Sequence, residues 1–132
     1  MADPLTNPDE LLFRQIHPSC MHNGAPASDR FKPQPSDGGM MSVDRGSLTT
    51  PSASHALYIG NGLQSAAVYG VAVNEFSSEN IECVEDPIAG TDTAVKNPAH
   101  ALADYTLHEE KKWKTISKRL WRNAVGRGQL YP

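Results

Sequence analysis

Ala66-Ala67-Val68-Tyr69-Gly70-Val71-Ala72-Val73 is the stretch of sequence that decides the fold of this chain. Its apolar residues run without the alternation that a half-exposed strand shows, and such a run is typical of a strand covered on both faces. We therefore expect residues 66–75 to form the central strand of a sheet, with Val68, Val71 and Val73 buried.

Shorter elements surround this strand. Further strands are expected at residues 11–17, 40–44, 81–84 and 100–105. Thr50 is a candidate N-cap and Pro51 suits the first position of a helix, so we expect a short helix over residues 51–59. Residues 19–40 contain many glycines and prolines and predict a long loop.

The hydrophobic period changes near His108. Trp113, Ile116, Leu120 and Ala124 recur at helical spacing and predict an amphipathic helix over residues 108–124, with the first three of these side chains buried. The pattern as a whole predicts an α+β fold with a small, mostly antiparallel sheet, one short packing helix and a basic C-terminal helix. We expect a core domain at residues 1–107, with a flexible N-terminal lead, and a basic helix and tail at residues 108–132.

Charge is divided unevenly along the chain. The last 22 residues hold seven of the twelve basic groups, and none of the fifteen acidic groups lies beyond Glu110. Residues 1–110 therefore carry a formal charge of −10 and residues 111–132 carry +7, within a net charge of −3. A basic tail on an acidic body predicts a separate contact for the tail.

Three contacts fit this tail. A protein partner with an acidic surface is the first, bound through Lys112, Lys118, Arg119 and Arg122. Nucleic acid is an alternative, since basic side chains neutralise phosphates and tryptophans stack on bases. The helix docked on its own acidic body is another. No apolar run is long enough for a membrane, and the polar start lacks the features of a secretory signal, so we expect a cytoplasmic protein without a membrane contact. The oligomeric state stays open.

A second group of polar residues belongs to the expected strands and their ends. The group consists of Arg14, His17, Ser42, Asp44, Arg45 and His100. Arg14 stands between apolar neighbours and needs an anionic partner if it is buried. We expect either a salt bridge with Asp44 or a cleft in which Arg14 binds a phosphate group.

Other site chemistry finds little support in the sequence. His17, Cys20 and His22 do not have the spacing of a zinc-binding pair, and a glycine-rich phosphate loop and a nucleophile elbow are both missing. We therefore expect neither a metal nor a cofactor. With only two cysteines and no secretory signal, we expect free thiols, one of them in the core.

Three segments carry a resemblance to a known group. They are Leu12-Phe13-Arg14-Gln15-Ile16-His17-Pro18, Met41-Ser42-Val43-Asp44-Arg45-Gly46 and Asn97-Pro98-Ala99-His100-Ala101. With Phe31-Lys32-Pro33 between them, they resemble a family of small, uncharacterised bacterial proteins over residues 11–105. The opening segment, the long loop and the helix before a strand are also similar to RES-type and other ADP-ribosyltransferase-like toxin domains.

Three functional hypotheses follow. The first is a non-catalytic interaction module, a small subunit of a bacterial assembly of the defence or toxin–immunity type, which contacts its partner through the basic helix. The second is the enzyme that the toxin-like resemblance implies, with Arg14 and His17 on substrate phosphates and His100 as the acid–base group. The third is a nucleic-acid binder that uses the tail.

Overall fold

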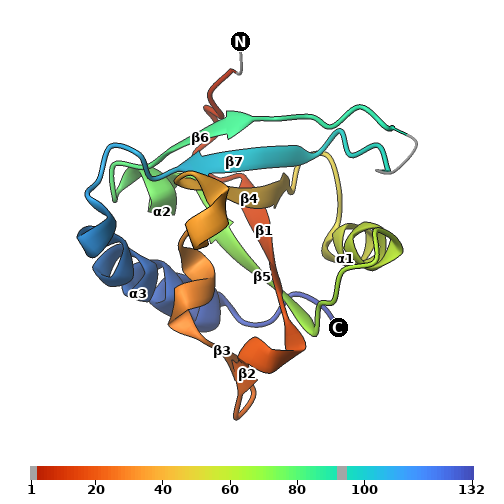
Figure 1. Ribbon diagram of the computed structural model, residues 1–132, viewed down its shortest axis with the longest axis horizontal. Helices are drawn as coiled ribbons and strands as arrows, with labels where there is room; N and C mark the ends of the chain where they lie inside the picture. Colours follow the sequence, from red (N-terminus) through yellow and green to blue (C-terminus); the bar gives the residue numbers. More distant parts are fainter. Residues whose placement is uncertain (1–2, 92–94) are drawn as a thin grey trace.

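A five-stranded antiparallel sheet forms the centre of the computed structural model, which describes residues 3–91 and 95–132 (Figure 1). The strand order is β5 (Ala67–Ala72), β1 (Leu11–Ile16), β4 (Met40–Arg45), β7 (His100–Asp104) and β6 (Glu82–Glu85). The helices are α1 (Pro51–Gly60), α2 (Val73–Ser77) and α3 (Glu110–Arg127). The α+β prediction is confirmed, and each expected strand and helix is present with boundaries shifted by a few residues.

The apolar stretch that forms β5 lies at the edge of the sheet, so the prediction of a central strand was wrong. Every residue of β5 is nevertheless buried. Val71 belongs to the core that α3 covers, while the chain near the C-terminus covers the outer edge, where the Val68 amide donates to the carbonyl oxygen of Tyr131 (2.9 Å). The unbroken apolar run therefore indicated that the strand is buried on all sides. An edge strand can also be buried in this way when the C-terminal segment packs over its outer edge.

This strand is also shorter than expected, because the chain turns into α2 at Val73. The Glu75 carboxylate accepts a hydrogen bond from the Ala72 amide (2.8 Å), which closes the first turn of α2. Val68, Val71 and Val73 are all buried, as predicted.

Helix α3 packs against the sheet through the face that its period predicted. Ile116, Leu120 and Ala124 are buried in one core with the apolar side chains of the strands. Trp113 is only half-buried and meets the ring of Tyr105 edge-on, at 5.9 Å between ring centroids. The division at residue 107 stays a prediction, but the buried side of α3 shares its core with the sheet.

Residues 19–39, which we call the strap, are a folded segment where the sequence indicated only a loop. The strap and the residue before it contain the short strands β2 (Met21–His22) and β3 (Ala25–Pro26) and the 3-10 turns η1 (Pro18–Cys20), η2 (Ser28–Phe31) and η3 (Pro35–Asp37). The Tyr105 hydroxyl donates to the Phe31 carbonyl oxygen (2.5 Å), and the Trp121 indole donates to the Pro26 carbonyl oxygen (2.6 Å). These contacts fasten the strap to the sheet and to α3.

The N-terminal lead follows the other edge of the sheet. The Leu5 amide donates to the Cys83 carbonyl oxygen (2.8 Å), and the Glu85 amide donates to the Asp3 carbonyl oxygen (2.9 Å). Both edges of the sheet are therefore covered by terminal segments, which removes exposed pairing groups. Cys20 and Cys83 are free thiols, and Cys83 is buried in the core. In the described part of the chain, no helix is long and apolar enough to span a membrane.

Candidate functional site

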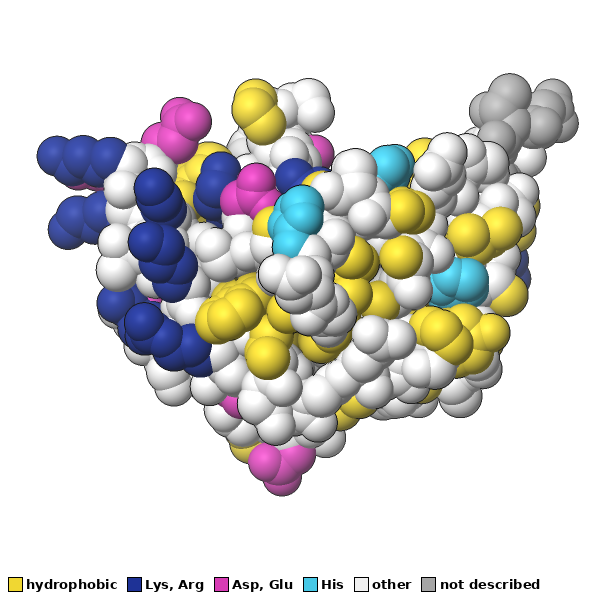
Figure 2. All heavy atoms as spheres, turned by 90° about the horizontal axis from the view of Figure 1, so that it is seen from below, with side chains coloured by type: hydrophobic (Ala, Val, Ile, Leu, Met, Phe, Trp, Pro, Cys, Tyr) yellow, Lys and Arg dark blue, Asp and Glu magenta, His cyan; other side chains and the backbone are white. Residues whose placement is uncertain are grey.

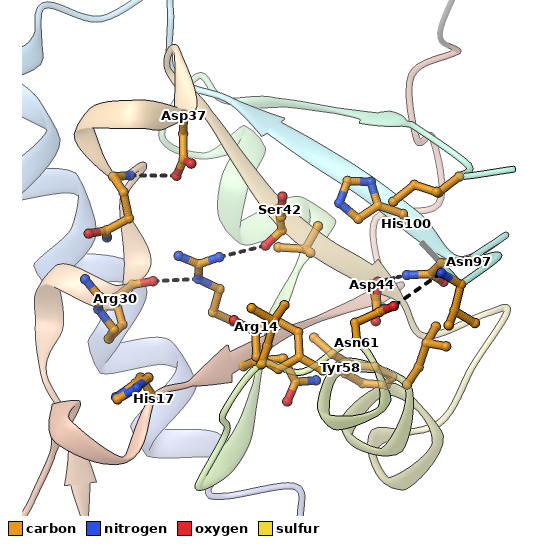
Figure 3. Close-up of a pocket in the computed structure, with 18 residues that line it drawn as sticks. Arg14, His17, Arg30, Asp37, Ser42, Asp44, Tyr58, Asn61, Asn97 and His100 are labelled. Atoms are coloured by element: carbon orange, nitrogen blue, oxygen red, sulfur yellow. Dashed lines mark hydrogen bonds between the residues drawn. The ribbon is translucent and has the colours of Figure 1, made fainter. Parts of the chain in front are cut away.

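The candidate site lies where β1 and β4 separate. β1 pairs with β5 over its whole length, but its pairing with β4 is confined to Leu12–Arg45 and Phe13–Asp44. Beyond Phe13, the side chain of Arg14 takes the place of the missing ladder. Its Nη1 donates to the Ser42 carbonyl oxygen of β4 (3.0 Å), and its Nε donates to the Arg30 carbonyl oxygen of the strap (2.8 Å) (Figure 3).

A cavity of about 400 Å³ opens around this side chain, between the strap on one side and α1 on the other. We call it the Arg14 pocket. It is lined by Phe13, Arg14, Gln15, His17, Arg30, Gln34, Asp37, Ser42, Val43, Asp44, Leu57, Tyr58, Asn61, Leu63, Ile88, Val95, Asn97 and His100. Five of the six polar residues that the sequence grouped together therefore share one pocket.

Arg14 forms no ion pair within the described part of the chain, and the Asp37 carboxylate in the same pocket favours its charge only from a longer distance. Among residues 3–91 and 95–132, none of the Arg14 nitrogens lies within 4.0 Å of an acidic oxygen, so the expected salt bridge with Asp44 was wrong. Arg14 instead faces a cleft, the other expectation, and phosphate binding there stays a prediction. Burial and the neighbouring Arg30 guanidinium lower the pKa of Arg14. A guanidinium nevertheless stays protonated in a protein, so the pocket contains an unpaired cation.

Asp44 is occupied by other donors. Ser54 of α1 donates its hydroxyl to one carboxylate oxygen (2.6 Å), and Asn97 donates its amide to the other (2.9 Å). Gln15 in turn donates to the Ser54 hydroxyl oxygen and accepts from Ser65, both at 2.8 Å. This continuous chain of hydrogen bonds fixes α1 on the sheet and forms a rigid floor for the pocket.

Arg45 is the one member of the predicted group that lies outside the pocket. It pairs with the buried Glu10 through two hydrogen bonds of 3.0 and 3.1 Å, and the Ser47 hydroxyl donates to the same carboxylate (2.6 Å). Burial would raise the pKa of Glu10, but the hydrogen bonds from Arg45 and Ser47 outweigh it and lower that pKa. Arg45 therefore anchors the start of β1 and has no part in the site.

The strap side of the pocket adds a second guanidinium. Arg30 is 20% exposed, and its Nε is buried without a hydrogen-bond acceptor among the described residues, with the Asp29 carboxylate 3.5 Å away. His17 stands exposed at the rim, where its Nδ1 accepts a hydrogen bond from the Ser19 amide (3.1 Å). Two guanidinium groups, an imidazole and the Asp37 carboxylate, which accepts a hydrogen bond from the Gln34 amide (2.7 Å), thus line this end (Figure 3).

His100 lines the opposite end and is oriented by a residue that the sequence did not indicate. Its Nδ1 lies 3.0 Å from the Asp86 carboxylate and 3.1 Å from the Asp86 carbonyl oxygen. Both partners are acceptors, so Nδ1 carries the proton and Nε2 is left as the basic nitrogen of the neutral ring. Asp86 follows β6, and only the pairing of β6 with β7 brings it to His100.

Apolar and amide side chains complete the α1 side of the pocket. Leu57 and Tyr58 come from α1, and Leu63 follows that helix. Ile88 and Val95 close the outer wall. The pocket therefore carries two guanidinium groups, an imidazole and one carboxylate near the strap and mainly apolar side chains near α1, a division that the sequence did not predict.

The four cations predicted to contact a partner, Lys112, Lys118, Arg119 and Arg122, are all exposed on α3, and their contact with a partner stays a prediction. Arg119 also forms a close ion pair with Glu79 (2.7 Å between Nη2 and Oε1). Figure 2 shows Lys and Arg side chains gathered over α3 at the left of the view. Within the described ranges, no three His, Cys, Asp or Glu residues are grouped as a metal site would require.

Comparisons of this chain with models of protein families, with curated proteins and with solved structures found no match.

Proposed function

We propose that this protein binds a phosphate-bearing small molecule in the Arg14 pocket. The observation that carries the proposal is the Arg14 guanidinium, which lines a cavity without a carboxylate partner in the described chain. A partly buried cation without an ion pair is stabilised by a bound anion, which would supply the missing charge. Phosphate is the anion that matches the planar donor array of arginine best.

The surroundings of Arg14 favour a ligand over a purely structural cation. Arg30 brings a second guanidinium to the same end of the pocket, and its buried Nε has no acceptor among the described residues. Two cations held side by side repel each other, and a doubly charged phosphate group would relieve that repulsion. A cavity of about 400 Å³ falls within the range of small-molecule sites.

The rest of the ligand would lie toward α1. Tyr58, Leu57, Leu63, Ile88 and Val95 offer apolar contacts there. A small molecule with a phosphate group at one end and an apolar or ring-shaped body at the other therefore fits the division of the pocket.

His100 gives the pocket a group for acid–base chemistry. Asp86 fixes the imidazole with Nε2 as its basic nitrogen, the arrangement in which histidine takes a proton from a substrate or water. This supports the hypothesis of a small ADP-ribosyltransferase-like enzyme with Arg14, His17 and His100 as its site residues, and the reaction stays a proposal.

Calorimetric titration tests the binding proposal. Pyrophosphate and ribose 5-phosphate should bind saturably at one site, whereas ribose should give no heat of binding. The Asp86→Asn variant should still bind pyrophosphate, because Asp86 orients His100 and does not touch the cationic end of the pocket. If wild-type protein binds neither phosphorylated compound, the proposal is wrong.

A second candidate function is the interaction module, a subunit that binds an acidic protein surface through α3. Lys114, Lys118 and Arg122 favour it, because all three are exposed and none has a carboxylate within 4.0 Å in the described part of the chain. Association of this kind weakens as salt rises. A bacterial assembly of the defence or toxin–immunity type would be one setting for such a contact.

A further inference from the structure

Three cations on α3 form a row that the fold does not need. Lys114, Lys118 and Arg122, which we call the basic stripe, recur every four residues and so lie about 6 Å apart along the helix axis. Like charges at this spacing repel each other and destabilise a helix. Arg119 and Arg127 have glutamate partners, whereas the three stripe cations, like Lys112, have no carboxylate within 4.0 Å in the described part of the chain.

A recess lies directly beside the stripe, between α3 and the strap. It has a volume of about 250 Å³ and is lined by Pro26, Ser28, Lys118, Trp121 and Arg122. The hydrogen bond from the Trp121 indole to the Pro26 carbonyl oxygen (2.6 Å) holds the aromatic ring in place. Two members of the basic stripe are therefore also walls of this Trp121 recess.

We infer that the basic stripe and the Trp121 recess bind a short acidic segment of a partner protein, with one apolar side chain of that segment in the recess. This inference rests on the second candidate function and names its binding residues. The recess is smaller than the roughly 300–1,000 Å³ of small-molecule sites, so a single side chain fits it better than a whole ligand. Tryptophan and arginine side chains in desolvated positions are also the residues that contribute most to protein interfaces.

The charge of the whole chain favours a protein segment over nucleic acid. Residues 1–110 carry a formal charge of −10, which repels a long polyanion that extends past α3. A nucleic acid gains affinity with each neutralised phosphate, and three stripe cations supply few such contacts. A short acidic segment can place its carboxylates on the stripe and end before it meets the acidic body.

Fluorescence anisotropy with labelled synthetic peptides tests this inference. The first peptide is acidic with one central leucine, the second has serine in place of that leucine, and an oligothymidylate of equal length is the third probe. The leucine peptide should bind, and the serine peptide should bind at least about fivefold more weakly. Lys118→Ala should weaken the leucine peptide by roughly two- to fivefold, whereas Lys112→Ala, an exposed cation outside the recess, should change it less.

Two recess variants and one control variant distinguish the contribution of the recess from that of the charges. Ser28→Phe should fill the recess and abolish the advantage of leucine over serine, and Trp121→Phe should reduce it, whereas Trp113→Phe should preserve it. If both peptides bind equally and Ser28→Phe has no effect, the recess inference is wrong while the acidic-partner function stands. If no acidic peptide binds, both are wrong. If oligothymidylate binds more tightly at physiological salt, nucleic acid replaces the acidic segment.

Discussion

Replacement of Arg14 by methionine removes one of the two guanidinium charges of the pocket and keeps most of the apolar stem of the side chain. The variant loses two charge-assisted hydrogen bonds, of 2.8 Å to the Arg30 carbonyl oxygen and 3.0 Å to the Ser42 carbonyl oxygen. Such bonds contribute about 1.5–3 kcal/mol each when their partners stay dry. Water in the pocket can reach both carbonyl groups, so we expect the free energy of unfolding to fall by only about 1–3 kcal/mol in total.

We expect Arg14→Met to weaken the binding of pyrophosphate as well as the stability of the fold. Loss of a charge-assisted contact with a phosphate group costs roughly 1.5–3 kcal/mol of binding free energy, which corresponds to about a 10- to 150-fold weaker affinity for pyrophosphate. Urea unfolding measures the change in the free energy of unfolding, and calorimetric titration measures the change in pyrophosphate affinity.

Arg127→Met is the matched control for this variant. Arg127 also donates to a backbone carbonyl oxygen, that of Gly70 (2.7 Å), and it pairs with Glu75; none of these residues lines the pocket. It should lose stability without any change in pyrophosphate affinity. An Arg14→Met protein that binds pyrophosphate as tightly as the wild type would refute the reasoning, because Arg14 would then be a structural cation only.

Three further predictions concern stability. Leu120→Ala should lower the free energy of unfolding by about 2–5 kcal/mol because Leu120 is fully buried. The control Leu107→Ala, at a side chain that is 80% exposed, should change that free energy by less than about 0.5 kcal/mol. Equal urea midpoints for the two variants would contradict this prediction. Val71→Asp should prevent folding, and a soluble variant with cooperative unfolding would show that the site is not core. The lowered pKa of Glu10 means that it stabilises the folded state above its ordinary value of 4.5 and loses this contribution as pH falls through the folded pKa. Glu10→Gln should therefore be less stable than wild type at neutral pH, and urea titrations should show the difference shrinking in acid.

The local elements of this fold were predictable because their signals are local. The Thr50 hydroxyl accepts a hydrogen bond from the Ala53 amide (3.2 Å), as its N-cap role required, and α3 buries Ile116 and Leu120 as its period indicated. Strand order was not predictable in the same way. The apolar run of β5 indicates that its residues are buried, but it does not indicate whether a neighbouring strand or the distant C-terminal segment buries them.

The sequence predicted most of the polar residues that share the pocket, but it did not predict which of them form hydrogen bonds with each other. An arginine between apolar residues indicated that Arg14 needed a special environment, and the strand ends supplied His17 and His100 to the same pocket. Asp44 was assigned to Arg14, yet Ser54 and Asn97 hold it, because a hydrogen-bond network depends on the final register of strands and helix. Asp86 carried no signal, since it meets His100 only after β6 and β7 have paired.

A crystal structure of the protein soaked with pyrophosphate tests the central claim most directly, because α3 offers a second cationic surface that competes for the anion. The account predicts phosphate oxygens within about 2.7–2.9 Å of the Arg14 guanidinium, inside the pocket between β1, β4 and the strap. Pyrophosphate found only on Lys114, Lys118 and Arg122, with the Arg14 pocket unchanged, would contradict it.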